Sequence, residues 1–241
     1  MANFNTHFTV AATASAVMSA IFMAMEVITP VEAVIAFSIG TLGGLMPDVD
    51  SANSKAIRVG FNVVSLLLTI MVVFVKSSVY SIVEMLVVSG VIFYTLRYGM
   101  IDLFRKISKH RGMFHSVPVA MIFGVSVAII MHLFFGLNAL ISWIYGIMTT
   151  FGYLVHLILD EVYSVDLGNR RVKKSLGTAL KFYRLKTQSD KIQNVIIYGS
   201  LLALMWVAPD TMMLQNALFS PEALMNFWDV FIPHDGNWFF K

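Results

Sequence analysis

The sequence contains no cysteine and few charged residues. Of its 241 residues, 13% are charged and 58% are hydrophobic, and the mean hydropathy is +0.76. Without cysteine the chain can form no disulfide, thiolate metal site or cysteine nucleophile, so any metal site must use histidine and carboxylate ligands. A soluble domain carries about a quarter charged residues, so a water-soluble fold does not explain this composition. Lys and Arg are also absent before the first apolar run, so we expect a retained first helix and not a cleaved secretory signal.

Apolar runs of about 20 residues, the length that a helix needs to cross a bilayer, predict an all-α, polytopic transmembrane helix bundle of about seven spans. The expected spans are Phe8–Met25, Val31–Met46, Val59–Val75, Val79–Leu96, Phe114–Phe135, Ala139–Asp160 and Gln193–Ala208. The membrane domain would cover residues 1–208, with insertions near 97–113 and 161–192. An aromatic and acidic tail, 209–241, suits an interfacial helix.

The basic residues are distributed unevenly between the two sides of this topology. Every Lys and Arg except Lys76 and Lys241 falls on one side. Cytoplasmic loops collect Lys and Arg, so we expect a cytoplasmic N-terminus in a bacterial-type inner membrane and an external tail. The basic insertions fit two roles, attraction to anionic headgroups or the holding of a substrate phosphate, and the sequence leaves both open.

Histidine and aspartate gather at the expected cytoplasmic ends of four helices. His156 and Asp160 are four residues apart, so on a helix they share a face and can bind one ion. Asp48 and Asp50 follow the helix-stopping Pro47, so both carboxylates can turn toward the same ion. Each motif alone also fits a purely structural role, as a histidine that packs between helices or an aspartate that forms a turn. Their joint position on one side of the membrane favours a metal site.

A basic segment enters the expected fifth span. Arg111 and His115 would share a helix face, and a guanidinium beside an imidazole suits a phosphate oxygen, which it can bind in a bidentate way. The alternative is a basic juxtamembrane segment with an incidental histidine. His132 and His234 fall on the other side of the membrane, so we do not expect them to be ligands.

Four motifs in this order resemble those of the LexA-binding, inner-membrane-associated hydrolases, also called membrane-bound metal-dependent hydrolases. They are an N-terminal histidine, a Leu-Pro-Asp-x-Asp motif, a His-Arg-Gly-x-x-His-Ser motif and a Gly-Tyr-x-x-His-Leu-x-x-Asp motif, here His7, Met46–Asp50, His110–Ser116 and Gly152–Asp160. The resemblance covers about the first 165 residues, with Met46 in place of Leu and Phe114 in place of Thr. The same order is distantly similar to the zinc-dependent phospholipases C, which hydrolyse phosphodiesters.

The resemblance implies a membrane-embedded hydrolase that acts on a phosphoester. The expected position of the site, at the headgroup level of the cytoplasmic face, suggests a phospholipid or a lipid-linked substrate. The resemblance also implies one or two divalent ions, zinc first and manganese or magnesium as alternatives, that lower the pKa of a water. The implied metal ligands are His7, Asp48, His115, His156 and Asp160. Asp50 would be a further ligand or the general base, and Arg111 with His110 would stabilise phosphoryl charge.

Two other classes of function compete with the hydrolase. A transporter would place ionisable residues near the middle of its spans, and the sequence offers almost none there beyond Glu84 and His132. A non-catalytic scaffold that binds a regulatory protein through the basic insertions is a closer rival. Membrane lipids are expected partners in every case, and nucleic acid is not.

Overall fold

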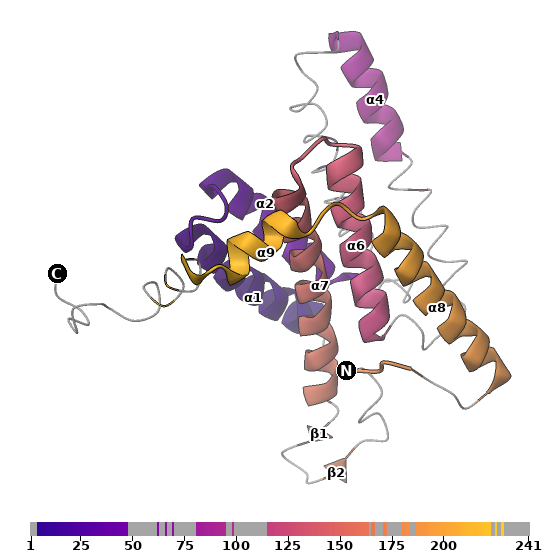
Figure 1. Ribbon diagram of the computed structural model, residues 1–241. Coiled ribbons are helices and arrows are strands. Elements are labelled where there is room, and N and C mark those ends of the chain that lie inside the picture. The colour runs from indigo at the N-terminus through magenta and orange to yellow at the C-terminus, as the bar shows by residue number, and fades with distance from the viewer. Residues whose placement is uncertain are drawn as a thin grey trace.

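The computed structural model describes residues 4–47, 62, 66, 69, 81–94, 98, 115–163, 165–166, 171–172, 180–183, 187–222, 225 and 228. Its helices in these ranges are α1 (Phe4–Ala24), α2 (Pro30–Gly43), α4 (Ile82–Tyr94), α6 (Val117–Leu133), α7 (Ala139–Val162), α8 (Gln188–Val207) and α9 (Met212–Phe219) (Figure 1). Strands β1 (Val165–Asp166) and β2 (Arg171–Val172) form a short antiparallel ladder. The described part of the chain is therefore a helical protein, as its apolar runs predict.

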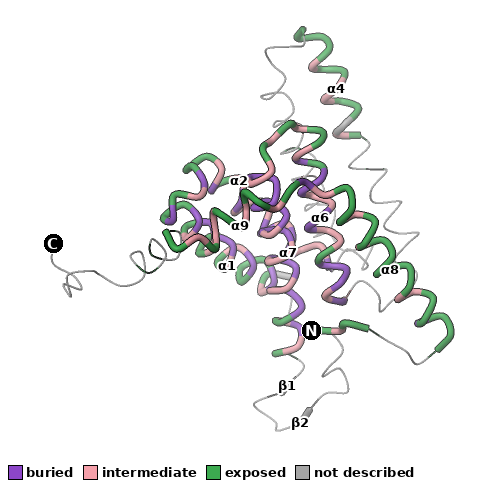
Figure 2. Tube along the Cα trace, viewed as in Figure 1, coloured by how far each residue is buried: buried purple, intermediate pink, exposed green. Residues whose placement is uncertain are grey.

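The bundle is built around α7, which packs against α1, α2, α6 and α9. Figure 2 shows α7 as mostly buried, whereas α4 and α8 are mostly exposed. The largest side chains on α7 that are removed from solvent are Tyr145, Tyr153, Ile144, Met148 and Leu157. Because four helices pack around it, α7 is the central helix of the bundle.

Glycine lets the backbones of α7 and its neighbours touch. A Cβ atom added at Gly152 would meet the carbonyl oxygen of Gly40, and one added at Gly146 would lie 2.6 Å from the carbonyl oxygen of Gly124. Membrane helices without a strong hydrophobic driving force associate through such close contacts between small residues. These glycines fix the distances from α7 to α2 and to α6.

Only α7 begins at its expected residue, and three of the other helices show what the apolar runs leave out. The first helix starts at Phe4, so His7 lies inside the helix, whereas the sequence placed it before the helix. α6 starts three residues later than expected, because Ser116 is extended and pairs with Lys181. α8 starts earlier, at Gln188, because Thr187 and Asp190 form a capping box.

The described residues contain fewer helices of membrane-spanning length than the seven spans expected from the sequence. Two helices, Asn5–Ala24 and Ala139–Val162, are long and apolar enough to cross a membrane, and α8 with α9 would make a third across a 91° bend. The shorter apolar helices include α2, whose 14 residues reach only about 21 Å, less than the roughly 30 Å of a bilayer core. Counting apolar residues overestimates span length here, because α2 ends at its glycine contacts. The expected span Val59–Val75 lies outside the described residues apart from three isolated positions.

Candidate metal centre

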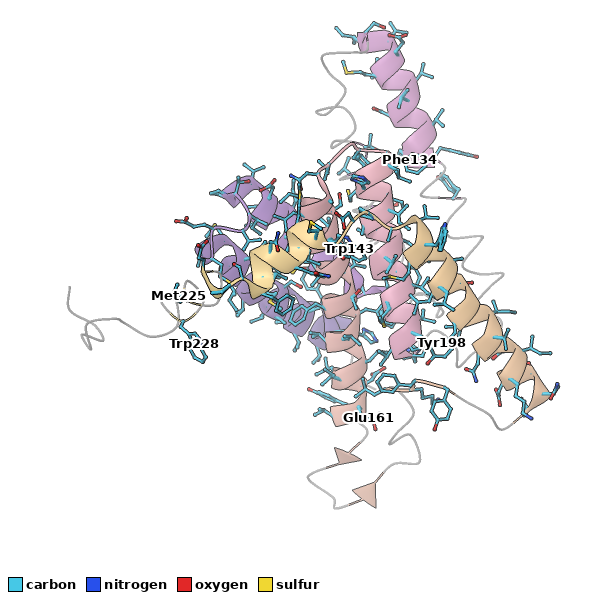
Figure 3. All side chains as sticks on the ribbon, in the orientation of Figure 1. Phe134, Trp143, Glu161, Tyr198, Met225 and Trp228 are labelled. Atoms are coloured by element: carbon cyan, nitrogen blue, oxygen red, sulfur yellow. The ribbon has the colours of Figure 1, made fainter. Side chains whose placement is uncertain are left out.

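Asp160, near the end of α7, lies among three histidines that come from three different parts of the chain. Its Oδ1 atom is 3.3 Å from Nε2 of His7 on α1. Its Oδ2 atom is 3.6 Å from Nε2 of His115, which precedes α6, and 3.7 Å from Nε2 of His156, one turn back on α7. The beginnings of α1 and α6 therefore meet the end of α7, and we refer to this part of the bundle as the His–Asp end. In Figure 3 the label of Glu161, the next residue after Asp160, marks where α7 reaches it.

These distances are long for hydrogen bonds and suit a shared ion. Hydrogen bonds of this type measure about 2.7–3.2 Å between heavy atoms. Two ligand atoms that each lie 2.0–2.1 Å from one tetrahedral zinc ion are roughly 3.3–3.4 Å apart. Ligand atoms of His7, His156 and Asp160 all lie within 4.8 Å of one another, so the three residues could hold one ion.

The two nitrogens of His156 have different environments. The Nδ1–H group donates a hydrogen bond of 2.7 Å to the carbonyl oxygen of Gly44, at the end of α2. This bond fixes the tautomer and leaves the lone pair on Nε2, which faces Asp160. Ligand histidines in metal sites commonly donate their second N–H in this way. The ring of His156 also stacks on the ring of His7, with centroids 3.8 Å apart and planes 13° apart.

The centre is buried and incompletely hydrogen-bonded. The side chains of His7 and Asp160 are 1% and 5% exposed. Among the described residues, neither ring nitrogen of His7 has a hydrogen-bond partner, and neither does Oδ1 of Asp160. Buried polar groups without partners cost about 1–3 kcal/mol each. A ligand that satisfies several of them at once therefore gains binding free energy. Imidazole nitrogen and carboxylate oxygen are donors that zinc accepts, so the residues present fit a divalent ion.

His115 forms the most accessible side of the centre, with 16% of its side chain exposed. The next residue, Ser116, pairs with Lys181, whose carbonyl oxygen accepts a 2.9 Å hydrogen bond from the N–H group of Val117. Phe182 in turn accepts a hydrogen bond of 2.8 Å from the hydroxyl of Tyr198 on α8. The segment Leu180–Tyr183 is therefore anchored on both sides next to His115.

Four of the residues proposed from the sequence cannot be placed. Asp48, Asp50, His110 and Arg111 lie outside the described residues. Pro47, which precedes Asp48, is described and buried. His132, which the sequence did not count as a ligand, lies in the last turn of α6, and its Nδ1–H group donates a 2.8 Å hydrogen bond to the carbonyl oxygen of Leu137.

The sequence did not reveal the carbonyl group of Gly44 as part of the centre. A backbone acceptor carries no side-chain signature, and Gly44 is 112 residues from His156 along the chain. The available signal was the glycine-rich end of the expected second span together with Gly152 one turn before His156. Glycine at these positions permits a close helix contact, but it does not show that the contact delivers a hydrogen bond to a candidate ligand.

Large apolar side chains are exposed along α4 and α8, as on the lipid-facing surface of a membrane protein. Val83, Leu202 and Trp206 are 70%, 73% and 90% exposed, and a soluble monomer rarely presents such an extended apolar surface to water. No curated protein and no solved structure matches the chain. The family described as YdjM inner membrane protein matches residues 1–169, which include every residue of the His–Asp end. On this match the chain belongs to the YdjM family of inner membrane proteins.

Proposed function

We propose that this protein is a membrane-embedded, metal-dependent hydrolase whose divalent ion is held by His7, His156 and Asp160, with His115 completing the set. The observation that carries the proposal is the surroundings of Asp160. Three imidazoles point Nε2 at one carboxylate from 3.3–3.7 Å. The buried nitrogens of His7 and the Oδ1 atom of Asp160 also have no hydrogen-bond partner in the described ranges.

A bound divalent ion would supply Lewis acidity and would lower the pKa of water at the site. The side chains around it have separate tasks. Asp160 draws the three imidazoles together and balances positive charge. His156 is held in one tautomer by the Gly44 carbonyl group. His115, on the exposed side, would be the ligand that lies nearest to a bound substrate.

Two of the unplaced aspartates are within reach of the centre along the chain. Asp48 follows Gly44 by four residues, which span at most about 14 Å. We propose Asp48 as a further ligand and Asp50 as a ligand or general base. These assignments follow the sequence motif Met46–Asp50 and the resemblance to membrane-bound metal-dependent hydrolases.

We propose a phosphoester of a phospholipid or a lipid-linked compound as the substrate. Three observations support it. The chain belongs to an inner-membrane family, Arg111 and His110 precede His115 in the sequence, and the order of motifs is similar to that of zinc-dependent phospholipases C. A guanidinium and an imidazole beside the accessible ligand would bind phosphate oxygens. The distribution of Lys and Arg supports a cytoplasmic location for this end of the bundle.

Hydrolysis by the full-length chain in lipid nanodiscs tests the proposal. The substrates would be fluorescent phospholipids and the soluble diester bis(p-nitrophenyl) phosphate, each with zinc or manganese supplied. We expect the wild type and the His132→Ala control to hydrolyse at least one of them, and the double variant His156→Ala, Asp160→Ala to be inactive. Equal metal content and equal function in the wild type and the double variant would instead favour a non-catalytic scaffold.

A further inference from the structure

Gly44 contacts α1 and α7 about one helical turn away from the candidate ligands, toward the middle of the bundle. A Cβ atom added at Gly44 would meet the Cβ atom of Ala11 on α1 and would lie 3.2 Å from the carbonyl oxygen of Gly152 on α7. Ala11 follows His7 by four residues, and Gly152 precedes His156 by four, so each shares a helix face with a candidate ligand. The end of α2 therefore sits between the two helices that carry His7 and His156.

The atoms that Gly44 touches cannot move away easily. The Cβ atom of Ala11 is fixed to the backbone of α1, and the carbonyl oxygen of Gly152 is part of the backbone of α7. Gly40, one turn earlier on α2, differs in this respect. A Cβ atom added there would meet the hydroxyl of Ser15 at 2.6 Å and the terminal methyl of Met148 at 2.8 Å, which can rotate away. The nearest atom fixed to a backbone, the Cβ atom of Ser15, lies at 3.0 Å, farther than the Ala11 Cβ atom lies from the one added at Gly44. A side chain at Gly44 therefore requires α1, α7 or the end of α2 to shift.

We propose that Gly44 is a positioning residue for the metal centre, an inference that rests on the proposed function. Its lack of a side chain sets the distance between α1 and α7, and so the 3.8 Å separation of the His7 and His156 rings. Its carbonyl group fixes the tautomer of His156. Both effects act on the candidate ligands, so Gly44 controls the affinity for the ion more than the stability of the bundle.

The test compares Gly44→Ala with a compensated variant and two matched glycine controls. In the double variant Ala11→Gly, Gly44→Ala, the added Cβ atom takes the space that the Ala11 Cβ atom leaves. Gly124→Ala creates a comparable clash between α6 and α7, where the new Cβ atom would meet Thr150 and the Gly146 carbonyl group. Gly199→Ala on α8 has nothing within 4 Å of the new atom. Zinc affinity, by competition with a chromogenic chelator, and thermal unfolding would be measured on each full-length protein in detergent.

We expect Gly44→Ala to lower zinc affinity about 10- to 100-fold, the range found when groups that support metal ligands are removed. The double variant should recover most of this loss. Gly124→Ala should lower the thermal midpoint without changing zinc affinity, and Gly199→Ala should change neither. If Gly44→Ala does not fold, Ala11→Val adds bulk to the same contact from α1 and should give the same loss of affinity.

Unchanged affinity in Gly44→Ala or Ala11→Val, or a loss that Ala11→Gly does not repair, would overturn the inference. If the wild type binds no zinc, the proposed function fails, and ¹⁵N NMR of the histidines in the metal-free protein then decides the inference separately. The His156 ring should show one tautomer, with the proton on Nδ1, in the wild type and a mixture of tautomers in Gly44→Ala. The same single tautomer in both proteins would contradict the role of Gly44.

Discussion

The two ends of the bundle differ in how their polar side chains are hydrogen-bonded. At the end opposite to the His–Asp end, His132 donates to Leu137, Trp143 donates to the carbonyl oxygen of Pro209 at 3.0 Å, and the Asn138 side chain accepts from Ile141 at 2.8 Å. At the His–Asp end, the nitrogens of His7 and one oxygen of Asp160 have no hydrogen-bond partner among the described residues. Both ends hold histidine, so residue type alone does not separate them.

Under the proposed function, this difference separates polar groups whose hydrogen bonds stabilise the fold from polar groups that a bound ion would satisfy. A histidine with a 2.8 Å hydrogen bond to a backbone carbonyl group completes a turn. Histidines held around a carboxylate at 3.3–3.7 Å gain little from hydrogen bonding. Two of them, His7 and His156, lie close enough to Asp160 and to each other that the three residues could hold one ion. Changes at the two ends should therefore separate metal affinity from stability.

Asp160→Ala should have the largest effect. It removes the one residue that contacts all three histidines, so we expect zinc affinity to fall by more than about 100-fold, beyond the range for groups that only support ligands. Competition with a chelator measures the affinity, and His132→Ala is the matched control from the opposite end. An equal loss of zinc affinity in Asp160→Ala and His132→Ala would show that the two ends do not differ in metal binding.

Chelation should lower the stability of the wild type. An ion that binds only the folded state at 100 times its dissociation constant contributes about 2.7 kcal/mol. A chelator should therefore lower the thermal midpoint of the wild type and of His132→Ala, but not that of Asp160→Ala. A chelator effect in Asp160→Ala as large as in the wild type would place the ion elsewhere.

Trp143→Phe tests the opposite end. It removes the donor to the Pro209 carbonyl group, a buried hydrogen bond that joins the start of α7 to the bend between α8 and α9. Leaving the acceptor without a partner should cost about 1–3 kcal/mol of unfolding free energy. Thermal unfolding should show this cost while zinc affinity stays at the wild-type value; a drop in affinity would mean that the two ends are coupled.

Thr29→Ala should have the smallest effect. Thr29 caps α2 together with Glu32, whose carboxylate accepts a 2.7 Å hydrogen bond from the Thr29 N–H group. Loss of such a cap costs about 1 kcal/mol. Thermal unfolding with and without zinc would measure it, and the same stability difference in both conditions is expected. A difference that grows with zinc would show that α2 transmits strain from its capped start to Gly44.

Local sequence signals predicted much of the fold. The apolar runs located α1, α2, α4, α6, α7 and α8 to within a few residues, because hydrophobicity and helix length are local properties. The start of α8 was also readable from Thr187 and Asp190, a capping pattern that the apolar run does not include. The expected span Val31–Met46 was already short and glycine-rich, in agreement with α2. The short length of α6 was not readable, since it depends on the pairing of Ser116 with Lys181.

The candidate site was only partly predictable for the same reason. The i, i+4 spacing of His156 and Asp160 is local, and alternating helix directions brought His7 and His115 to the same end. The stacking of His7 on His156 and the hydrogen bond from His156 to Gly44 depend on how three helices approach one another. No sequence pattern contains that information.

Metal analysis of the full-length protein tests the central claim most directly. The chain would be purified in detergent, resupplied with zinc, dialysed and analysed by mass spectrometry for all divalent metals, with His156→Ala and His132→Ala prepared in parallel. We predict stoichiometric metal in the wild type and in His132→Ala, and none in His156→Ala. A wild type that holds no stoichiometric metal after resupply, or a His156→Ala variant that holds as much as the wild type, would contradict the account.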